Sequence, residues 1–293
     1  MRDAATITLA TSRLFFIAGN RFYAGFHHNL QLNDSALSII VCSESSRIKL
    51  LLSNFLSNFL NRRLNITQYL LQNDCLLCSA SCTGDLCRAC HDSLPQLPAN
   101  HCPLCLLPAI NSRICGACLA SPPTWTHAIA ALQYAFPIDA MIRSLKYQQN
   151  LTLVPMLSRL LTAKLSNVPS PEVIIPVPLH PARLQHRGFN QVVEIGRYVS
   201  RQLRIPLLPH VCERTRDTLS QTELSWKERR SNLRNAFACT SPFAHKHVAI
   251  LDDVMTSGAT LNELAKVIRK QGANEISVWV IARAMPSFTS KGY

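Results

Sequence analysis

The sequence lacks several features that would each have pointed to a particular class of protein. No apolar run is long enough to cross a bilayer, since the run at residues 14–18 is short, lacks a cleavage context of the kind a secretory signal has, and soon meets polar and basic residues. Acidic residues are scarce, with 17 Asp and Glu against 30 Lys and Arg, which gives a formal net charge of +13. We therefore expect a cytoplasmic chain without a transmembrane segment, and the positive charge favours polyanionic partners such as phosphates, pyrophosphate or nucleic acid.

Proline is absent from residues 1–70, and so is glycine after Gly25. This region is rich in Leu, Ser and Asn and carries no recognisable motif, so we predict an N-terminal extension that is poorly ordered or helical. Apolar residues near its end recur at helical spacing, which predicts an amphipathic helix; they are Leu50, Leu51, Phe55, Phe59 and Leu60.

Cysteine, in contrast, is abundant in the middle of the chain. Eight of the 12 cysteines form four Cys-x-x-Cys pairs in two near-identical units. The first unit consists of Cys75, Cys78, Cys87 and Cys90, and the second of Cys102, Cys105, Cys115 and Cys118. Two residues between paired cysteines let both sulfurs reach one ion, and four thiolates complete a tetrahedral zinc site without an open position. We expect two structural zinc ions in a double zinc-ribbon module over residues 71–123, one per unit.

Alternatives to this zinc assignment stay open from spacing alone. The paired cysteines of the two units could cross over, Cys82 or His91 could replace a ligand, and an iron–sulfur cluster is a minor possibility. Cys212 and Cys239 are isolated in the sequence, and we expect them to behave as small apolar residues.

From residue 124 the pattern changes to alternating strands and helices. Strands are expected over 128–134, 173–177, 248–251 and 276–281, and helices over 138–147, 151–165, 190–203 and 260–271. Strands separated by helices predict parallel crossovers, and hence an α/β domain with a doubly wound, mainly parallel sheet over residues 124–285, followed by a short tail at 286–293.

One segment of this domain has the composition of a phosphate-binding site. The apolar strand over 248–251 leads into Asp252 and Asp253, and a loop of small and hydroxyl residues then precedes a helix: Met255, Thr256, Ser257, Gly258, Ala259 and Thr260. Backbone N–H groups of such a loop and of the helix N-terminus bind phosphate, while the two carboxylates suit ribose hydroxyls and Mg²⁺. The motif predicts a pocket for phosphoribosyl pyrophosphate (PRPP). A P-loop, the nearest rival, would need a lysine that this loop lacks.

Other polar residues fit the same ligand. A predicted loop after the strand over 173–177 carries Arg183, Arg187 and Gln191, which suit pyrophosphate oxygens, although a solvated basic turn would have the same composition. Lys146 could reach phosphate or lie on a helix surface. The polar stretch that follows Arg214 is predicted to be a lid that excludes water, with Thr218, Gln221, Arg230 and Asn232.

Taken in order, these motifs resemble the ComF family, including its GntX-type members. The resemblance runs over residues 75–283, from the four Cys-x-x-Cys pairs through R-S-L-K-Y, I-I-P-V-P-L-H-P-A-R-L-Q-H-R-G-F-N-Q, R-T-R-D-T-L-S-Q and V-A-I-L-D-D-V-M-T-S-G-A-T-L. It implies a type I phosphoribosyltransferase fold preceded by zinc ribbons. It also implies a role in natural competence, in the uptake of single-stranded DNA or in DNA utilisation, with a DNA-import helicase as a partner of some members.

Two hypotheses about function follow. In the first, the chain is a phosphoribosyltransferase that binds PRPP with Mg²⁺ and transfers the phosphoribosyl group to an acceptor that the sequence does not identify. Its catalytic residues would be Asp252, Asp253, Arg187 and Lys146. In the second, the same fold is a non-catalytic component of the uptake machinery that binds single-stranded DNA through its basic surface and zinc ribbons.

Overall fold

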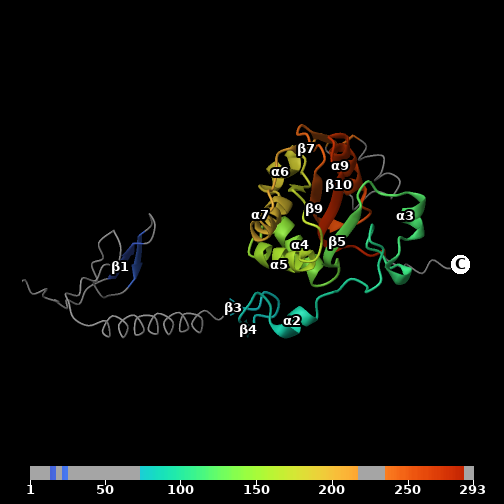
Figure 1. Ribbon diagram of the computed structural model, residues 1–293. Coiled ribbons are helices and arrows are strands. Elements are labelled where there is room, and N and C mark those ends of the chain that lie inside the picture. Colours follow the sequence, from blue (N-terminus) through green and yellow to red (C-terminus); the bar gives the residue numbers. More distant parts are fainter. Residues whose placement is uncertain (1–13, 18–21, 26–72, 217–234, 287–293) are drawn as a thin grey trace, which may run out of the picture. The chain divides into compact units, whose positions relative to one another are not determined.

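A computed structural model describes residues 14–17, 22–25, 73–216 and 235–286 (Figure 1). The chain divides into two compact units, Met1–Leu70 and Leu71–Tyr293. In the first unit β1 (Leu14–Ile17) and β2 (Phe22–Gly25) form an antiparallel pair, where the sequence predicted no strand. Aromatic residues in both segments favour strands. The helix expected over residues 50–60 lies outside the described residues.

A four-stranded sheet forms the centre of the second unit. Its strands are β5 (His127–Gln133), β6 (Val173–Pro176), β9 (His247–Met255) and β10 (Glu275–Arg283). Their order is β5-β10-β9-β6, and every neighbouring pair is parallel. The predicted α/β class with a parallel sheet is therefore confirmed. Parallel strands that are covered on both faces read as continuous apolar runs, which is why 248–251 and 276–281 were recognisable in the sequence.

Helices cover both faces of this sheet, as a doubly wound fold requires (Figure 1). One layer consists of α4 (Ile138–Tyr147), α5 (Leu153–Leu165) and α7 (Gln191–Leu203). The other layer consists of α9 (Ala259–Lys270) and an antiparallel ribbon of β7 (Cys212–Arg214) and β8 (Phe237–Cys239). Both sides of the sheet are thereby buried, and its carboxyl-terminal edge is left for polar groups.

Two segments differ from the sequence prediction. The basic stretch expected as a loop contains α6 (Pro181–Arg187), which begins after His180 as N-cap and ends at Gly188, whose φ is 81°. Proline at the first position and glycine after the end are helix signals, but none of the residues of α6 is buried, so the segment has no apolar periodicity to reveal it. The stretch after Arg204, expected to be irregular, contains β7 and β8.

The two cysteine units are built from short elements. These are β3 (Asn73–Asp74), β4 (Ser81–Cys82), α2 (Arg88–Asp92), a 3-10 helix (Ile110–Ser112) and α3 (Gly116–Ala120). The chain between them lies along the free edge of β5, because Ala128 N donates to Pro103 O over 2.8 Å and Gln133 N donates to Pro95 O over 2.7 Å. This pairing covers an edge that would otherwise be open. The domain boundaries that the sequence predicts at 123/124 and 285/286 remain predictions.

In the described part of the chain, no helix combines the length and apolar character needed to cross a membrane.

The packing of α5 gives a test of this architecture. Leu157 is fully buried in the layer that α5 forms with α7 and the sheet. Replacing it by alanine (Leu157→Ala) should lower the free energy of unfolding by about 2–5 kcal/mol, since the core loses apolar contacts and retains a cavity. Urea denaturation followed by tryptophan fluorescence measures this loss. Lys164→Ala on the exposed side of the same helix is the control and should change stability by less than about 0.5 kcal/mol. Equal effects of the two substitutions would contradict the assigned packing.

Candidate functional site

The acidic pair lies inside β9, whereas the sequence placed it just after the strand. β9 continues to Met255 and pairs with β10 over its whole length. Asp252 lies opposite Val280, and Met255 lies opposite Arg283. β6 has already ended at Pro176, opposite Leu251. The carboxylates therefore lie beyond the end of β6, at the carboxyl-terminal edge of the sheet, where ligands of open α/β sheets bind. The apolar run ends at Leu251, which is why the strand was predicted too short.

Asp253 is the centre of a buried polar network. Lys146 of α4 donates through Nζ to Asp253 Oδ1 over 2.8 Å, and Gln191 of α7 donates through Nε2 to Asp253 Oδ2 over 2.5 Å. Gln191 in turn accepts from Arg187 Nη1 through its Oε1 over 2.6 Å. The Arg187 guanidinium also lies over the Tyr147 ring, 5.5 Å from its centroid. The network therefore brings together four of the predicted site residues from α4, α6, α7 and β9.

The position of Gln191 follows from the cap of α7. Asn190 accepts from Val192 N through its side-chain oxygen over 2.9 Å and donates through Nδ2 to Val177 O over 3.1 Å. The first contact begins the helix, and the second ties its start to the residue after β6. Gln191 is thereby held over the end of the strand next to β9, and it is 3% exposed.

The network fixes the ionisation of its members. Burial opposes the charge on Lys146, but the Asp253 carboxylate outweighs that effect and raises the pKa of Lys146. Burial, followed by repulsion from Asp253, raises the pKa of Asp252 to about 7, against the opposing effects of Lys146, the Asp253 backbone N–H and Arg214. The Asp253 N–H donates to Asp252 Oδ1 over 2.8 Å. Of the two carboxyl groups in the site, Asp252 therefore loses its proton at a higher pH than an ordinary aspartate does.

Arg214 is a site residue that the sequence analysis did not identify. It is the last residue of β7, is 6% exposed, lies 5.7 Å from the centroid of the Phe237 ring, and lowers the pKa of Asp252. Side chains alternate between the two faces of a strand, so Asp252 shares the face of Val248 and Ile250, and Asp253 shares that of Ala249 and Leu251. Arg214 therefore belongs to the β7–β8 side and Lys146 to the side of α4 and α7.

The hydroxyl loop joins β9 to α9. Gly258 is the N-cap of α9 and has a φ of 75°, a conformation that residues with a side chain rarely adopt. A Cβ atom there would lie 3.2 Å from Trp125 Cη2. Ser257 accepts from Ala259 N through Oγ over 3.3 Å, and Thr256 and Thr260 border the same turn. The loop therefore places three hydroxyl residues at the N-terminus of a 12-residue helix, which favours an anion.

Arg283 holds the start of this loop in place. This residue is 4% exposed and donates through Nη1 to Met255 O over 2.8 Å, to Ala284 O over 2.6 Å and also to Thr256 O. Its Nε donates to Cys105 O over 2.6 Å, and Trp125 Nε1 donates to Leu104 O over 2.8 Å. Arg283 and Trp125 thus connect the loop to the second cysteine unit, a contact between distant residues that has no signal in the sequence.

Met255 and Arg183 are two further residues that the sequence predicted for the site. Met255 is buried and its carbonyl accepts a hydrogen bond from Arg283, and Arg183 lies one turn before Arg187 on α6. The predicted lid residues Thr218, Gln221, Arg230 and Asn232 lie outside the described residues. The strands on either side of them, β7 and β8, pair in antiparallel register.

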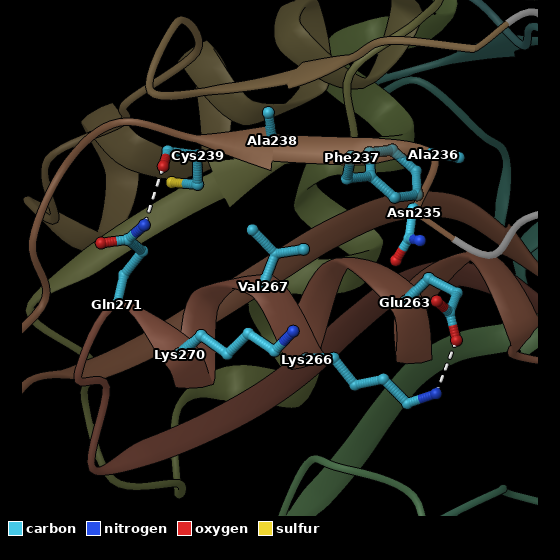
Figure 2. Close-up of a pocket in the computed structure, with 10 residues that line it drawn as sticks. All are labelled: Asn235, Ala236, Phe237, Ala238, Cys239, Glu263, Lys266, Val267, Lys270 and Gln271. Atoms are coloured by element: carbon cyan, nitrogen blue, oxygen red, sulfur yellow. Dashed lines mark hydrogen bonds and ion pairs between the residues drawn. The ribbon is translucent and has the colours of Figure 1, made fainter.

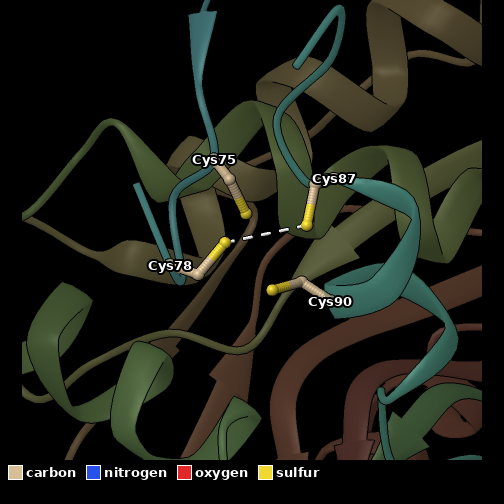
Figure 3. Close-up of side chains that lie close together, drawn as sticks. All are labelled: Cys75, Cys78, Cys87 and Cys90. Atoms are coloured by element: carbon tan, nitrogen blue, oxygen red, sulfur yellow. Dashed lines mark hydrogen bonds between the residues drawn. The ribbon is translucent and has the colours of Figure 1, made fainter. Parts of the chain in front are cut away.

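Each cysteine unit brings its four thiols together, and Figure 3 shows those of the first unit. One group consists of Cys75, Cys78, Cys87 and Cys90, the other of Cys102, Cys105, Cys115 and Cys118, and within each group the sulfurs lie within 4.8 Å of one another. Cys78 Sγ is 3.7 Å from Cys87 Sγ, and Cys105 Sγ is 3.6 Å from Cys115 Sγ. Four sulfurs bound to one zinc ion at about 2.3 Å are separated by roughly 3.8 Å. Each unit can therefore hold one zinc ion with its own cysteines, without crossed pairing and without Cys82 or His91.

Cys212 and Cys239 lie directly opposite each other on β7 and β8, with their Sγ atoms 2.8 Å apart. The strand pairing brings together two residues that are isolated in the sequence. Both are buried among core residues, and burial raises the pKa of Cys212, followed by the effect of Cys239. Their place in the apolar cluster agrees with the small apolar character that the sequence predicted.

A groove of about 340 Å³ lies between β8 and α9, away from this site (Figure 2). Its polar lining includes Lys266, which pairs with Glu263 over 2.6 Å, and Lys270. It contains neither the acidic pair nor the hydroxyl loop. We therefore place the candidate site at the end of β9 and not in this groove.

Several known proteins are similar to this chain. No family model matches the chain. Competence protein F of Haemophilus influenzae is 37% identical over 209 residues, which cover 68% of this chain and 90% of that protein. DNA utilization protein YhgH of Escherichia coli O157:H7 is 37% identical over 191 residues, 63% of this chain and 84% of that protein. Among solved structures, a purine phosphoribosyltransferase from Pyrococcus horikoshii is 22% identical, with a TM-score of 0.28, over 47% of this chain and 75% of that one.

The raised pKa of Asp252 predicts a pH-dependent stability of the unliganded chain. Its ordinary pKa is 3.8 and its folded pKa is about 7, so the folded chain binds the proton more tightly than the unfolded chain. The contribution of Asp252 to the free energy of unfolding is fully present below pH 3.8 and is lost as the pH rises to about 7. Asp252→Asn should therefore raise the melting temperature relative to wild type increasingly from pH 4 to pH 7, and by a constant amount above that.

Thermal melts in buffers across this range measure the difference. Glu213→Gln removes an exposed carboxylate from β7 and is the control, for which we expect no such trend. A constant difference between Asp252→Asn and wild type at every pH would overturn the assignment.

Proposed function

The chain belongs to the ComF family, and we propose that it binds PRPP together with Mg²⁺ at the carboxyl-terminal edge of its sheet. The observation that carries this proposal is the network in which Lys146 and Gln191 bind Asp253 and Arg187 binds Gln191, directly before a hydroxyl loop at the N-terminus of α9. Carboxylates suit ribose hydroxyls and hard cations, and a helix N-terminus suits a phosphate. The carboxylates and the helix N-terminus therefore match the two ends of a phosphoribosyl ligand.

Each part of the site has a separate role in this proposal. The loop from Thr256 to Thr260 would bind the 5′-phosphate through N–H groups and hydroxyls, with Gly258 allowing the close approach. Asp252 and Asp253 would accept hydrogen bonds from the ribose hydroxyls. Arg187 and Lys146 would bind pyrophosphate oxygens, and Arg183 lies close by on α6 to extend this set. Mg²⁺, when bound with the ligand, would neutralise charge on the pyrophosphate.

A transferase reaction is the activity that such a site supports best. Loss of pyrophosphate from the anomeric carbon leaves a cationic sugar, which needs nearby carboxylates and protection from water. Asp252 and Asp253 supply the carboxylates. We propose that the segment between β7 and β8 excludes water, with the residues Thr218, Gln221, Arg230 and Asn232. The acceptor is unassigned. The two cysteine units would each hold a structural zinc ion, and a cytoplasmic location stays a prediction of the sequence.

Binding of single-stranded DNA is the second candidate function. It is favoured by the net charge of +13 and by relatives that are named for competence and for DNA utilisation. The role in DNA uptake and a helicase partner are proposals of the same kind. The two functions are compatible, because the polar site lies at one edge of the sheet and the basic residues are distributed over the whole chain.

Calorimetric titration with PRPP in the presence of Mg²⁺ tests the first function. Wild type should bind, and Lys146→Met should weaken binding by about tenfold or more, since a charged hydrogen bond contributes about 1.5–3 kcal/mol. Asp253→Asn should have a similar effect. Lys164→Met removes an exposed charge from α5 and is the matched control, with unchanged affinity. Absence of binding by wild type, or equal binding by Lys146→Met and wild type, would contradict the proposal.

Fluorescence anisotropy with a labelled oligodeoxynucleotide tests the second function. If the basic residues bind phosphates, the logarithm of the association constant should fall linearly with the logarithm of salt concentration, by about 0.7 per neutralised phosphate. We expect at least three phosphates to be neutralised, which corresponds to a slope of roughly −2 or steeper. A flat dependence on salt, or no binding at low salt, would exclude an electrostatic DNA-binding function.

A further inference from the structure

A cluster of metal-ligand type lies at the opposite edge of the sheet from the acidic pair. His127, His247 and Glu275 are the first residues of β5, β9 and β10, and each offers one ligand atom within 4.8 Å of the other two. The strand order explains the grouping, because β10 lies between β5 and β9. In this register Glu275 is opposite His247, and His127 is opposite Ser277, two residues further along β10. Three adjacent parallel strands thus begin with potential metal ligands.

The hydrogen bonds around the cluster leave one of its ring nitrogens unsatisfied. His127 Nδ1 lies 3.2 Å from Thr126 Oγ1 and 3.8 Å from Glu275 Oε1, whereas His127 Nε2 is buried and has no hydrogen-bond partner among the described residues. A buried polar atom without a partner costs about 1–3 kcal/mol. If Nδ1 carries the proton, Nε2 presents a bare lone pair, which is the state of imidazole that binds a metal ion.

The surrounding groups hold the ligands as outer partners of a metal site do. His247 Nε2 lies 3.1 Å from Ser277 Oγ, which leaves Nδ1 as its other ring nitrogen, and the His247 backbone N–H donates to Glu172 Oε2 over 2.6 Å. Such contacts orient the ligands of natural metal sites. The two imidazole rings are 5.9 Å apart between centroids and inclined by 65°, so they are not stacked on each other.

The donor set decides which class of ion would fit. Two imidazoles and one carboxylate suit zinc and other divalent first-row transition metals, whereas Mg²⁺ and Ca²⁺ prefer oxygen ligands only. Three protein ligands leave one coordination position for water or another ligand. Solvent can supply it, because the side chains of His127 and Glu275 are 24% and 39% exposed.

We propose that His127, His247 and Glu275 form a third metal site, which takes a divalent transition-metal ion such as Zn²⁺ and keeps one position open to solvent. Ligands of one zinc ion at about 2.1 Å are roughly 3.4 Å apart, so the side chains close inward from their present spacing when the ion binds. The ion joins the first residues of β5, β9 and β10. This site is independent of PRPP binding and differs in ligand type from the two cysteine sites.

Zinc titration of the full chain tests the proposal. The protein is first dialysed against a weak chelator until its zinc content is constant at the two equivalents that the cysteine units account for. Calorimetric titration with Zn²⁺ should then show one further equivalent. His247→Ala should abolish it, and Glu275→Gln, which keeps the shape but removes the charge, should weaken it by tenfold or more. His210→Ala removes an exposed histidine from another part of the unit and should bind as wild type does.

Thermal melts separate a lost site from a lost fold. Zinc beyond two equivalents should raise the melting temperature of wild type and of His210→Ala, and that of Glu275→Gln by less, whereas without added zinc Glu275→Gln should melt at the temperature of wild type. The proposal is overturned if wild type takes up no third equivalent, which would mean that ordered water alone satisfies His127. It is equally overturned if Glu275→Gln and His247→Ala bind zinc as tightly as wild type, because the ion would then lie elsewhere.

Discussion

The buried guanidinium of Arg283 is the contact on which the candidate site depends most. A charged group that is 4% exposed is tolerated only if its N–H groups find acceptors, and here these are the carbonyls of Cys105, Met255, Thr256 and Ala284. Burial lowers the pKa of Arg283, and Cys105 and Cys118 oppose that shift. One side chain thus joins the last residues of β9 and β10 to a Cys-x-x-Cys turn. A side chain without a guanidinium could not donate to all four carbonyls at once.

The second cysteine unit therefore supports the site from outside. Besides the Cys105 carbonyl, it offers the Leu104 carbonyl to Trp125, whose ring lies where a side chain at position 258 would be. Cys102 and Cys118 belong to the same apolar cluster as Leu261 and Leu264 of α9. Metal held by the four thiols would fix the turn that carries these carbonyls, because the folding of such small units is coupled to metal binding. The shape of the hydroxyl loop consequently depends on the integrity of a unit that never contacts the ligand in our proposal.

Local patterns in the sequence revealed some of these features and not others. The parallel sheet, the helices over 138–147 and 190–203 and the grouping of the eight cysteines follow from periodicity and spacing within short windows, and they could be predicted. The length of β9 could not, because Asp252 and Asp253 interrupt the apolar run, and only Lys146, Gln191 and Arg214 from other elements make their burial possible. The pairing of Cys212 with Cys239 and the contacts of Arg283 depend on residues far apart in sequence. Such contacts leave no periodic signal.

The pairing within the site also constrains how a ligand can enter it. In the free chain each oxygen of Asp253 accepts one hydrogen bond, from Lys146 and from Gln191, and Asp252 accepts from the Asp253 N–H. Each carboxylate oxygen can accept a second hydrogen bond, so a ribose hydroxyl could bind beside these partners, while a pyrophosphate would attract the charge of Lys146. A cation that arrives with the ligand lowers the cost of ionising Asp252, whose pKa burial and Asp253 raise to about 7. A ligand that brings both anionic and cationic groups, such as the metal-bound sugar pyrophosphate that we propose, would therefore suit the charges of this site.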